Sequence, residues 1–397
     1  MKRLNNLYPN INNIESIKIA DTHARKGKHN WGIVKHDQHK ESDYLRLLES
    51  LQTDSYKTSE YDTFKVYEPK ERVIYRLPYF PDRIAQWDIM LTMEPIWVKL
   101  FINHTYSCIK GRGIHKLAFD VKKALKTNPS GTQYCLKLDI KKFYPSINHN
   151  ILKYDILRKK IKDKRLLKLL DEIVDSTDGV PIGNYLSQFF ANLYLTYMDH
   201  WLKEEVHVKY YFRYADDIVI LSNSKERLRT ILILIKMYLH QVLKLEVKQN
   251  YQIFPVSSRG IDFAGYVFYH THTQLRKSIK LRLQRCVNKF KAGKMSQETL
   301  KKKLAAYFSW LKYCDSKHLL QKLEKETGIH FSNWVGTEVS LRQFKGKYIR
   351  IIEIVQYSKY YKVHAIYRNR PYTLRSANKE LLNNMVSERL PRNYKIL

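Results

Sequence analysis

Residues 212–217 read Phe-Arg-Tyr-Ala-Asp-Asp, and they place two adjacent acids between two extended segments. Residues 208–214 before the acidic pair and 218–221 after it are mostly apolar or aromatic. Two such runs around a short polar step predict a β-hairpin with Asp216 and Asp217 at its tip. Because aspartate is also common in ordinary turns, the pair alone leaves a plain acidic turn as an alternative.

A second aspartate closes an apolar strand. Residues 134–140 read YCLKLDI and predict a buried strand that ends at Asp139, where a helix or turn cap is the alternative reading. A helix-containing crossover would place this strand beside the hairpin in one sheet. Paired Mg²⁺ ions that drive nucleotidyl transfer are held by such carboxylates. Asp139, Asp216 and Asp217 are therefore candidates to share two Mg²⁺ ions, or Mn²⁺ as a possible substitute, with the plain turn and the cap as the alternatives at this point.

The composition indicates a nucleic-acid partner. Lys and Arg total 71 against 38 Asp and Glu, which gives a formal net charge of +33. Thirty Tyr, 15 Phe and six Trp accompany these cations, and aromatic rings stack on bases while cations hold phosphates. The four cysteines form no CxxC pair, and there is no apolar signal or membrane-length run. We therefore expect a cytoplasmic protein with reduced thiols and no membrane partner.

The rest of the chain alternates helical and extended patterns. Residues 23–29 are a basic run that predicts an arm after an N-terminal helix. The other expected elements are helices at 150–175, from the Gly/Pro turn 179–183 to about 203, at 225–243 and at 274–326, a hairpin at 258–268, and strands within 345–372.

Several segments, in this order along the chain, resemble the motifs of reverse transcriptases. Residues 137–147 resemble the first catalytic motif, residues 179–188 the template- and nucleotide-facing motif, and residues 212–217 the aromatic-x-Asp-Asp motif. Further segments resemble the fingers and later palm motifs: KERVIYRLPYFPDR (70–83), SCIKGRGIH (107–115), LEVKQN (245–250) and GIDFAGY (260–266). The resemblance covers roughly residues 50–325.

The resemblance implies an α+β right-hand polymerase fold, with fingers, a palm built on an antiparallel sheet, and a helical thumb. It implies RNA-directed DNA polymerase activity on template RNA and dNTPs, with an RNA–cDNA duplex as product. The expected division is a basic N-terminal extension (1–48), fingers (49–130), palm with fingers elements (131–270), helical thumb (271–328) and a small β-rich basic module (329–397).

The same resemblance implies residue roles. Asp139 and Asp216 would bind metal directly with the Ile140 carbonyl, while Asp217 would support the primer-side metal. Lys248 would act as a general acid or as a charge partner for pyrophosphate, unless it is simply a solvated lysine. Tyr144 would exclude a 2′-hydroxyl, unless it is a core tyrosine. The remaining candidates are nucleotide-binding Arg72, Ile182 and Gln188 and template- or primer-binding Arg83, Lys110, Arg112, Gly113, Asn184, Ser187, Gly265 and Tyr266.

The pair Ser187-Gln188 is similar to the form found in diversity-generating retroelements. Those enzymes make frequent errors opposite adenine and work with a small basic accessory protein. Ile182 offers no hydrogen bond to a base, which is our hypothesis for loose base selection. A reverse transcriptase of a group II intron, a retron or a phage-defence system is the alternative, and a non-catalytic RNA-binding protein is a remote one.

Residues 197–200 read Tyr-Met-Asp-His and superficially echo a catalytic Tyr-Met-Asp-Asp. They fall inside the helix expected after the Ser187-Gln188 pair, and the second acid is missing. The sequence therefore predicts no catalytic role for Asp199.

Overall fold

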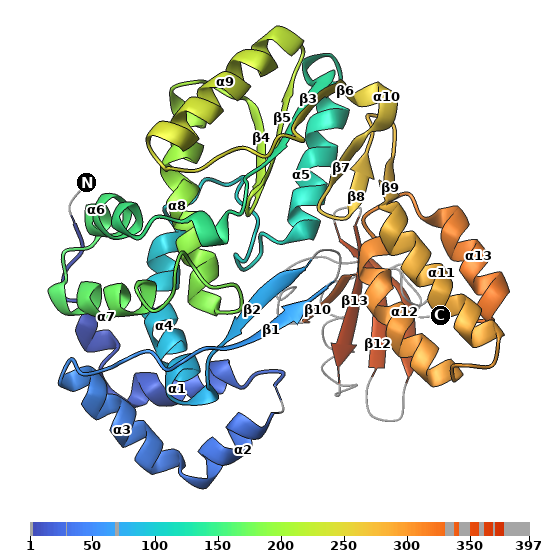
Figure 1. Cartoon of the computed structure of the whole chain (residues 1–397). Coiled ribbons are helices and arrows are strands. Elements are labelled where there is room, and N and C mark those ends of the chain that lie inside the picture. Colours follow the sequence, from blue (N-terminus) through green and yellow to red (C-terminus); the bar gives the residue numbers. More distant parts are fainter. Residues whose placement is uncertain are drawn as a thin grey trace. The chain divides into compact units, whose positions relative to one another are not determined.

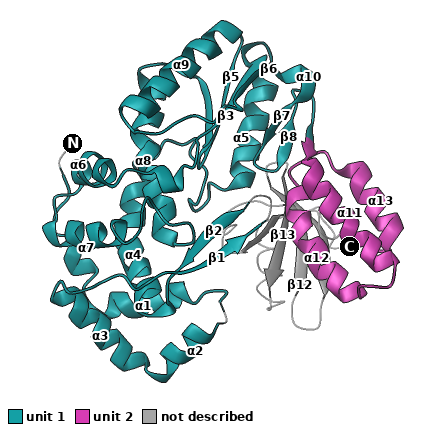
Figure 2. Cartoon of the chain, in the orientation of Figure 1, with its two compact units in different colours: residues 1–273 teal, residues 274–397 magenta. Residues whose placement is uncertain are grey.

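The computed structural model describes residues 3–28, 30–67 and 71–329, and beyond them only the backbone of four strands. The chain divides into two compact units, residues 1–273 and 274–397 (Figure 2). Each unit is described by itself. The predicted palm–thumb boundary after residue 270 lies close to this division, and the other predicted boundaries remain predictions.

Unit 1 opens with three helices, α1 (Ile14–Ala24), α2 (Trp31–Gln38) and α3 (Lys40–Gln52), preceded by the short turn η1 (Tyr8–Asn10). The side chain of Asn13 caps α1 by accepting from the Ser16 amide, as expected at a helix N-terminus.

The predicted basic arm is wrong over residues 23–28, because residues 23 and 24 complete α1 and residues 25–28 lie in the short connection to α2. The Arg25 guanidinium lies 2.6 Å from Asp21 and 2.9 Å from Asp37, so two helices hold it in place. His29, the last residue of the predicted arm, lies outside the described residues.

The fingers-like region begins with the antiparallel hairpin of β1 (Asp62–Val66) and β2 (Arg72–Arg76), and the turn η2 (Tyr79–Arg83) follows. The helix α4 (Ile84–Val98) is buried along much of its length, because apolar residues lie around most of its circumference. It packs against α1 on one side and α8 (Tyr185–Glu204) on another.

The centre of unit 1 is a four-stranded antiparallel sheet in the order β4-β5-β3-β6. Its strands are β3 (Tyr134–Asp139), β4 (Tyr210–Tyr214), β5 (Asp217–Ser222) and β6 (Gln252–Pro255). The helix α9 (Lys225–Gln241) covers one face through contacts with β3, β5 and β6, and α5 (Ile114–Thr127) packs on β4 (Figure 1). The interior strand β5 is buried at its four central residues, so it forms the core of the sheet.

The single helix predicted over 150–175 is broken into η5 (Ile151–Leu157), α6 (Arg158–Lys160) and α7 (Lys164–Val174). The break has a physical cause in Asp163, whose carboxylate accepts from the Leu166 amide and caps α7. The same carboxylate also accepts from the backbone amides of Leu7 and Tyr8 at 2.7 and 2.9 Å. The N-terminal segment therefore stops one helix and starts the next.

The predicted hairpin at 258–268 is present as β7 (Ile261–Phe263) and β8 (Tyr266–Phe268), after the short helix α10 (Val256–Arg259). The strand β9 (Thr273–Leu275) ends this part of the chain.

Unit 2 contains three helices, α11 (Lys277–Lys291), α12 (Gln297–Leu311) and α13 (Lys317–Thr327), in the region predicted to be helical. Most of their buried residues are apolar, among them Leu283, Leu304 and Leu323, and Thr327 is also buried. A four-stranded sheet follows in the order β10-β13-β12-β11, with strands β10 (Thr337–Ser340), β11 (Arg350–Gln356), β12 (Tyr361–Tyr367) and β13 (Arg370–Ser376). The last three strands contain most of the extended structure predicted within 345–372, and the rest of the module at 329–397 lies outside the described residues.

Candidate active site

The two acidic features meet on the central sheet. In the antiparallel pair of β3 and β5, Asp139 lies directly opposite Asp217, so their side chains share one face. Asp216 lies in the turn between β4 and β5, where Ala215 adopts a left-handed conformation with φ of 54°. The structure therefore brings the three predicted acids together at the ends of adjacent strands.

The carboxyl of Asp216 holds its proton more tightly than an ordinary aspartate. Burial and then the negative charge and hydrogen bond of Asp139 raise its pKa to about 7. The Oδ1 atom of Asp139 is buried and receives no hydrogen bond from a donor group among the described residues. Such an incompletely satisfied acidic pair is suited to a cation, which would compensate both charges.

The donor chemistry fits Mg²⁺ without a complete protein cage. No convergent group of three or more His, Cys, Asp or Glu residues occurs in the described part of the chain. Mg²⁺ is typically held by one or two carboxylates, with substrate phosphates and water as the other ligands. The pair Asp139 and Asp216 meets this requirement. Ile140, predicted to add its carbonyl, follows Asp139 and bridges to Val247.

Lys248 lies directly at the acidic pair. Its Nζ atom donates to Oδ2 of Asp139 at 2.6 Å, and its backbone amide donates to the Asp139 carbonyl at 2.8 Å. This double link explains how residue 248, distant in sequence, is fixed beside the site. The lysine is therefore a bound cation of the site.

A cavity of about 450 Å³ opens beside Asp139 and Asp217. Lys137, two residues before Asp139 on the same strand face, donates to the Asp262 carbonyl and lies 3.7 Å from Asp217 Oδ2. Other lining residues are Asn250, Gln252, Phe254 and Arg259. Sequence reasoning assigned no role to Lys137 or Arg259, although the period of two along β3 offered a signal for Lys137.

Tyr144 lies close enough to Asp216 to interact with it electrostatically. Its hydroxyl has a raised pKa, chiefly because of burial and in part because of the charges of Cys108 and Asp216. The neutral phenol is therefore retained across ordinary pH.

The motif at 179–188 connects the start of α8 with the hairpin β1–β2. The Tyr75 amide donates to the Ile182 carbonyl at 2.8 Å, and Gly183 has a φ of 134°. Asn184 and Ser187 are buried, whereas Ile182 and Gln188 are half-buried. Asn184 donates to the Tyr61 hydroxyl at 3.2 Å, so its amide already has a structural partner.

A second cavity, of about 540 Å³, lies between the N-terminal helices and the fingers hairpin. Its wall includes the predicted site residues Arg83 and Asn184, together with Trp31, Phe64 and Arg76. The Arg83 side chain is half-buried and donates to the Ala24 carbonyl at 3.0 Å, and burial lowers its pKa. Arg83 therefore anchors the N-terminal helices as well as lining the cavity.

The other predicted contacts differ in accessibility. Arg72 and Lys110 are exposed, and Gly113 is an exposed residue at the start of α5. Arg112 donates to the Ile102 carbonyl at 3.0 Å and so supports its own loop.

Both candidates on the hairpin β7–β8 are buried. Gly265 lies at the tip of the hairpin with a φ of 91°, a conformation that only glycine readily adopts, so it has a role in forming the turn. The Tyr266 side chain is fully buried, which is a packing environment, so the burial does not support its predicted contact with nucleic acid.

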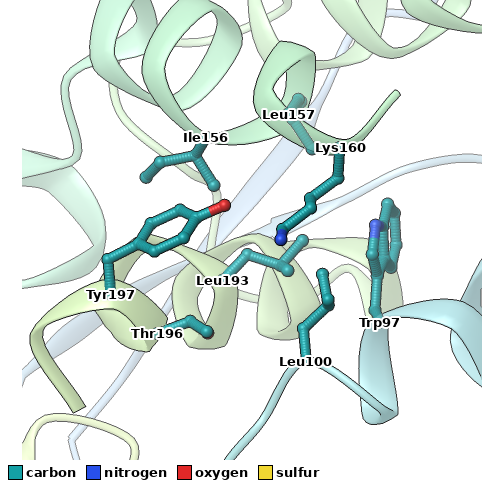
Figure 3. A pocket seen from close by; sticks show the side chains of 8 residues that line it. All are labelled: Trp97, Leu100, Ile156, Leu157, Lys160, Leu193, Thr196 and Tyr197. Carbon is teal, nitrogen blue, oxygen red and sulfur yellow. The ribbon is translucent and has the colours of Figure 1, made fainter. Parts of the chain in front are cut away.

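A third hollow, shown in Figure 3, is bordered mainly by apolar side chains from α4, α8 and η5. Its volume of about 10 Å³ leaves room for no more than one water molecule. It is a packing gap and is too small for a nucleotide. No helix in the described part of the chain combines the length and apolar character needed to cross a bilayer.

Comparison with known proteins agrees with this geometry. Residues 65–268 match the family described as Reverse transcriptase (RNA-dependent DNA polymerase). The chain is similar to the Retron Ec73 reverse transcriptase of Escherichia coli, with 27% identity over 241 residues that cover 56% of this chain and 73% of that protein. It is also similar to the Group II intron-encoded protein LtrA of Lactococcus lactis subsp. cremoris, with 20% identity over 327 residues that cover 63% of this chain and 54% of LtrA.

Among solved structures, apo telomerase from Candida tropicalis aligns with a TM-score of 0.44 and 12% identity over 70% of this chain and 61% of that chain. We draw nothing further from this likeness. The chain spans about half the length of LtrA. The family match covers half of the present chain and contains all three acids, and it confirms the predicted α+β right-hand polymerase fold and the predicted enzyme class. The chain therefore belongs to the reverse transcriptases, the family of RNA-dependent DNA polymerases.

Proposed function

We propose that this protein synthesises DNA on an RNA template by two-metal nucleotidyl transfer at Asp139, Asp216 and Asp217. The observation that carries the proposal is the register of β3 and β5, which sets Asp139 opposite Asp217 and beside the turn that holds Asp216. When bound, two Mg²⁺ ions would activate the primer 3′-hydroxyl and neutralise the transferring phosphate. Asp139 and Asp216 would hold these ions with the Ile140 carbonyl, and Asp217 would support the primer side.

The chain's own residues would then select and place the reactants. Lys248 is held at Asp139 and would deliver a proton to the departing pyrophosphate. Tyr144 would form the floor under the sugar of the incoming deoxynucleotide, and the exposed guanidinium of Arg72 would grip its phosphates. Lys137 and Arg259, which line the cavity beside the acids, would hold the primer backbone.

The template would pass along the fingers. Lys110, Arg112 and Gly113 lie in the loop before α5, where two cations and small residues suit a phosphate backbone. Ile182 and Gln188 would face the templating base and nucleotide, with Asn184 and Ser187 supporting them from within the fold. Gly265 would let the β7–β8 turn approach the primer.

The finer proposal is a mutagenic enzyme of a diversity-generating retroelement, which would act with a small basic accessory protein. It is supported by the Ser187-Gln188 pair and by the aliphatic side chain of Ile182, which offers no hydrogen bond to a base. A second candidate is a reverse transcriptase of a retron, a group II intron or a phage-defence system. The similarity to the Retron Ec73 enzyme and to LtrA favours this candidate.

Primer extension on a neutral RNA template, with and without Mg²⁺, tests the activity. We expect Mg²⁺-dependent DNA product from the wild type and none from the double variant Asp216→Asn, Asp217→Asn. If that variant still extended the primer, the activity would come from a contaminating polymerase, and the protein would be a non-catalytic RNA binder. Sequencing the product separates the finer candidates, since errors concentrated opposite adenine support the mutagenic one.

A further inference from the structure

Arg213, the basic residue of the Phe-Arg-Tyr-Ala-Asp-Asp motif at residues 212–217, is fully buried. Arg213 lies on β4, three residues before Asp216, and its side chain and that of Asp199 are both 0% exposed. The Nε and Nη2 atoms of Arg213 donate to the two carboxylate oxygens of Asp199 at 2.9 and 2.6 Å. This bidentate geometry is the strongest pairing of arginine with a carboxylate.

The same guanidinium also holds the hairpin tip. Its Nη1 atom donates to the Ala215 carbonyl at 3.0 Å and to Asn192 Oδ1 at 3.1 Å. Ala215 has a φ of 54°, a conformation that is unfavourable for a residue with a Cβ atom. The Ala215 carbonyl belongs to the peptide that joins Ala215 to Asp216, so the guanidinium restrains the backbone from which the catalytic carboxylate projects.

The partners of Arg213 come from the helix that follows the nucleotide-facing motif. Asn192 and Asp199 lie two turns apart on α8, and therefore on one face of it. Asp199 also accepts from the Tyr211 hydroxyl at 2.6 Å, and Asn192 donates to the Ser107 carbonyl at 2.8 Å. A rigid chain of contacts thus runs from α8 to the tip of the catalytic hairpin.

We infer that Arg213 and Asp199 are positioning residues, which set the Asp216 carboxylate for metal binding by fixing the Ala215 carbonyl. This inference rests on the proposed polymerase activity. It gives Asp199 a positioning role, which the sequence Tyr-Met-Asp-His around it does not indicate. A salt bridge buried this deeply is weak support for stability by itself, because desolvation of the two charges offsets their attraction. The additional bond to Ala215 is what connects the pair with the chemistry.

Arg213→Lys separates positioning from charge. Lysine keeps the charge beside Asp199, but its single ammonium cannot reproduce the planar fork that reaches both Asp199 and the Ala215 carbonyl. We expect kcat to fall by at least about tenfold, as for other small displacements of reacting groups. The KM for dNTP should change by less than about twofold, because the nucleotide contacts remain. The affinity for Mn²⁺ in the absence of substrate should fall as well. The loss of the EPR signal of free Mn²⁺ on binding measures this affinity.

Arg158→Lys is the matched control. Arg158 also forms a double hydrogen bond with an aspartate, Asp171, but this pair links α6 to α7 and is partly exposed. Its replacement should leave kcat, KM and Mn²⁺ affinity as in the wild type. If a folded Arg213→Lys protein behaves like Arg158→Lys, the inference is wrong.

The double variant Asp199→Asn, Arg213→Met covers the case in which Arg213→Lys does not fold. It removes both buried charges together and keeps an oxygen acceptor for the Tyr211 hydroxyl, while the Ala215 carbonyl still loses its donor. Weaker Mn²⁺ binding in a folded double variant supports the inference. Wild-type Mn²⁺ affinity overturns it, and so does loss of the cooperative thermal transition in both variants, which would make the pair purely structural. An inactive wild type would refute the polymerase proposal, whereas the Mn²⁺ titration would still test the positioning.

Discussion

The Nζ atom of Lys248 lies 2.6 Å from Oδ2 of Asp139, so a lysine cation already binds a carboxylate that we propose as a metal ligand. The contact lies next to the acidic pair of Asp139 and Asp216, whose charges interact. A metal ion and the ammonium group therefore compete for one carboxylate until substrate phosphate gives the lysine another partner.

This competition predicts opposite effects of Lys248→Met on binding and turnover. Without substrate, loss of the ammonium should tighten Mn²⁺ binding, because Asp139 loses its competing cation. Single-nucleotide extension should slow by about 10²-fold if the lysine is the general acid.

Lys141→Met is the control, since Lys141 forms an exposed pair with Glu246 at 2.8 Å. It should alter neither quantity. Unchanged extension with tighter Mn²⁺ binding would restrict Lys248 to a charge-balancing role, and unchanged values of both would remove it from the site.

The raised pKa of Asp216 predicts a particular pH dependence of stability. Folding raises the pKa of this carboxyl from 3.8 to about 7, so the folded state binds the proton more tightly than the unfolded state. The contribution to stability is full below the unfolded pKa and is lost as the pH rises through the folded value. In metal-free buffer, the Tm of the wild type should therefore fall between roughly pH 4 and pH 7 more steeply than that of Asp216→Asn.

Differential scanning calorimetry of the two proteins isolates this effect, because their other titrating groups are shared. The exposed Glu226→Gln variant serves as a control and should follow the wild type. Mg²⁺ at pH 8 should restore stability to the wild type and give little to Asp216→Asn. If the Tm of the wild type and that of Asp216→Asn changed in parallel with pH, the raised pKa of Asp216 in the folded state would be contradicted.

The sequence was sufficient to predict the parts of the site that depend on local pattern. Apolar runs beside Asp139 and beside Asp216-Asp217 predicted strands, and the structure pairs those strands with Asp139 opposite Asp217. The reason is that a strand with one buried face allows few registers. A shift of the β3–β5 register by one residue would have pointed the Asp139 side chain into the core.

Interactions between distant residues were not predictable in the same way. The sequence offers no pattern that links Arg213 to Asp199, because a charge inside an apolar run indicates burial but not the identity of its partner. The predicted helix over 150–175 failed for a similar reason: Asp163 caps a new helix, and its carboxylate also accepts hydrogen bonds from the backbone amides of Leu7 and Tyr8, which lie far away in the sequence. The basic run at 23–28 was misread as an arm because Asp37, which binds Arg25, lies in the next helix.

Gly183 is predicted to be indispensable to the motif at 179–188. Its φ of 134° is rarely adopted by other residues, and a Cβ atom there would collide with the Tyr75 carbonyl. Gly183→Ala should lower the free energy of unfolding by about 1–3 kcal/mol through backbone strain, with a further loss from the collision. Gly27→Ala is a useful control, since its φ is also positive but nothing lies within 4 Å of its Cβ position. Equal losses in urea unfolding of the two variants would show that the contact with Tyr75 contributes nothing.

Ile182 is predicted to affect fidelity. An aliphatic side chain offers no hydrogen bond to a base, so Ile182→Gln should reduce misincorporation opposite adenine. Deep sequencing of cDNA from a defined template measures this rate, with Ile182→Val as a control that keeps the side chain apolar. An unchanged error spectrum in Ile182→Gln would dispose of the hypothesis.

Trp31 is predicted to bind an unpaired template base. Its indole is 74% exposed at the edge of the 540 Å³ cavity, whose wall also includes Phe64 and Arg76. Aromatic stacking on a base contributes about 1–3 kcal/mol, so Trp31→Ala should weaken binding of a template with a single-stranded 5′ overhang by about 5- to 150-fold. Binding of a blunt duplex should be unchanged, because it has no base to place in the cavity. Ile19→Ala, which removes another exposed apolar side chain from the N-terminal helices, is the control and should bind both substrates normally. If Trp31→Ala weakens both substrates equally, the tryptophan supports the fold of the N-terminal helices and does not stack on the template.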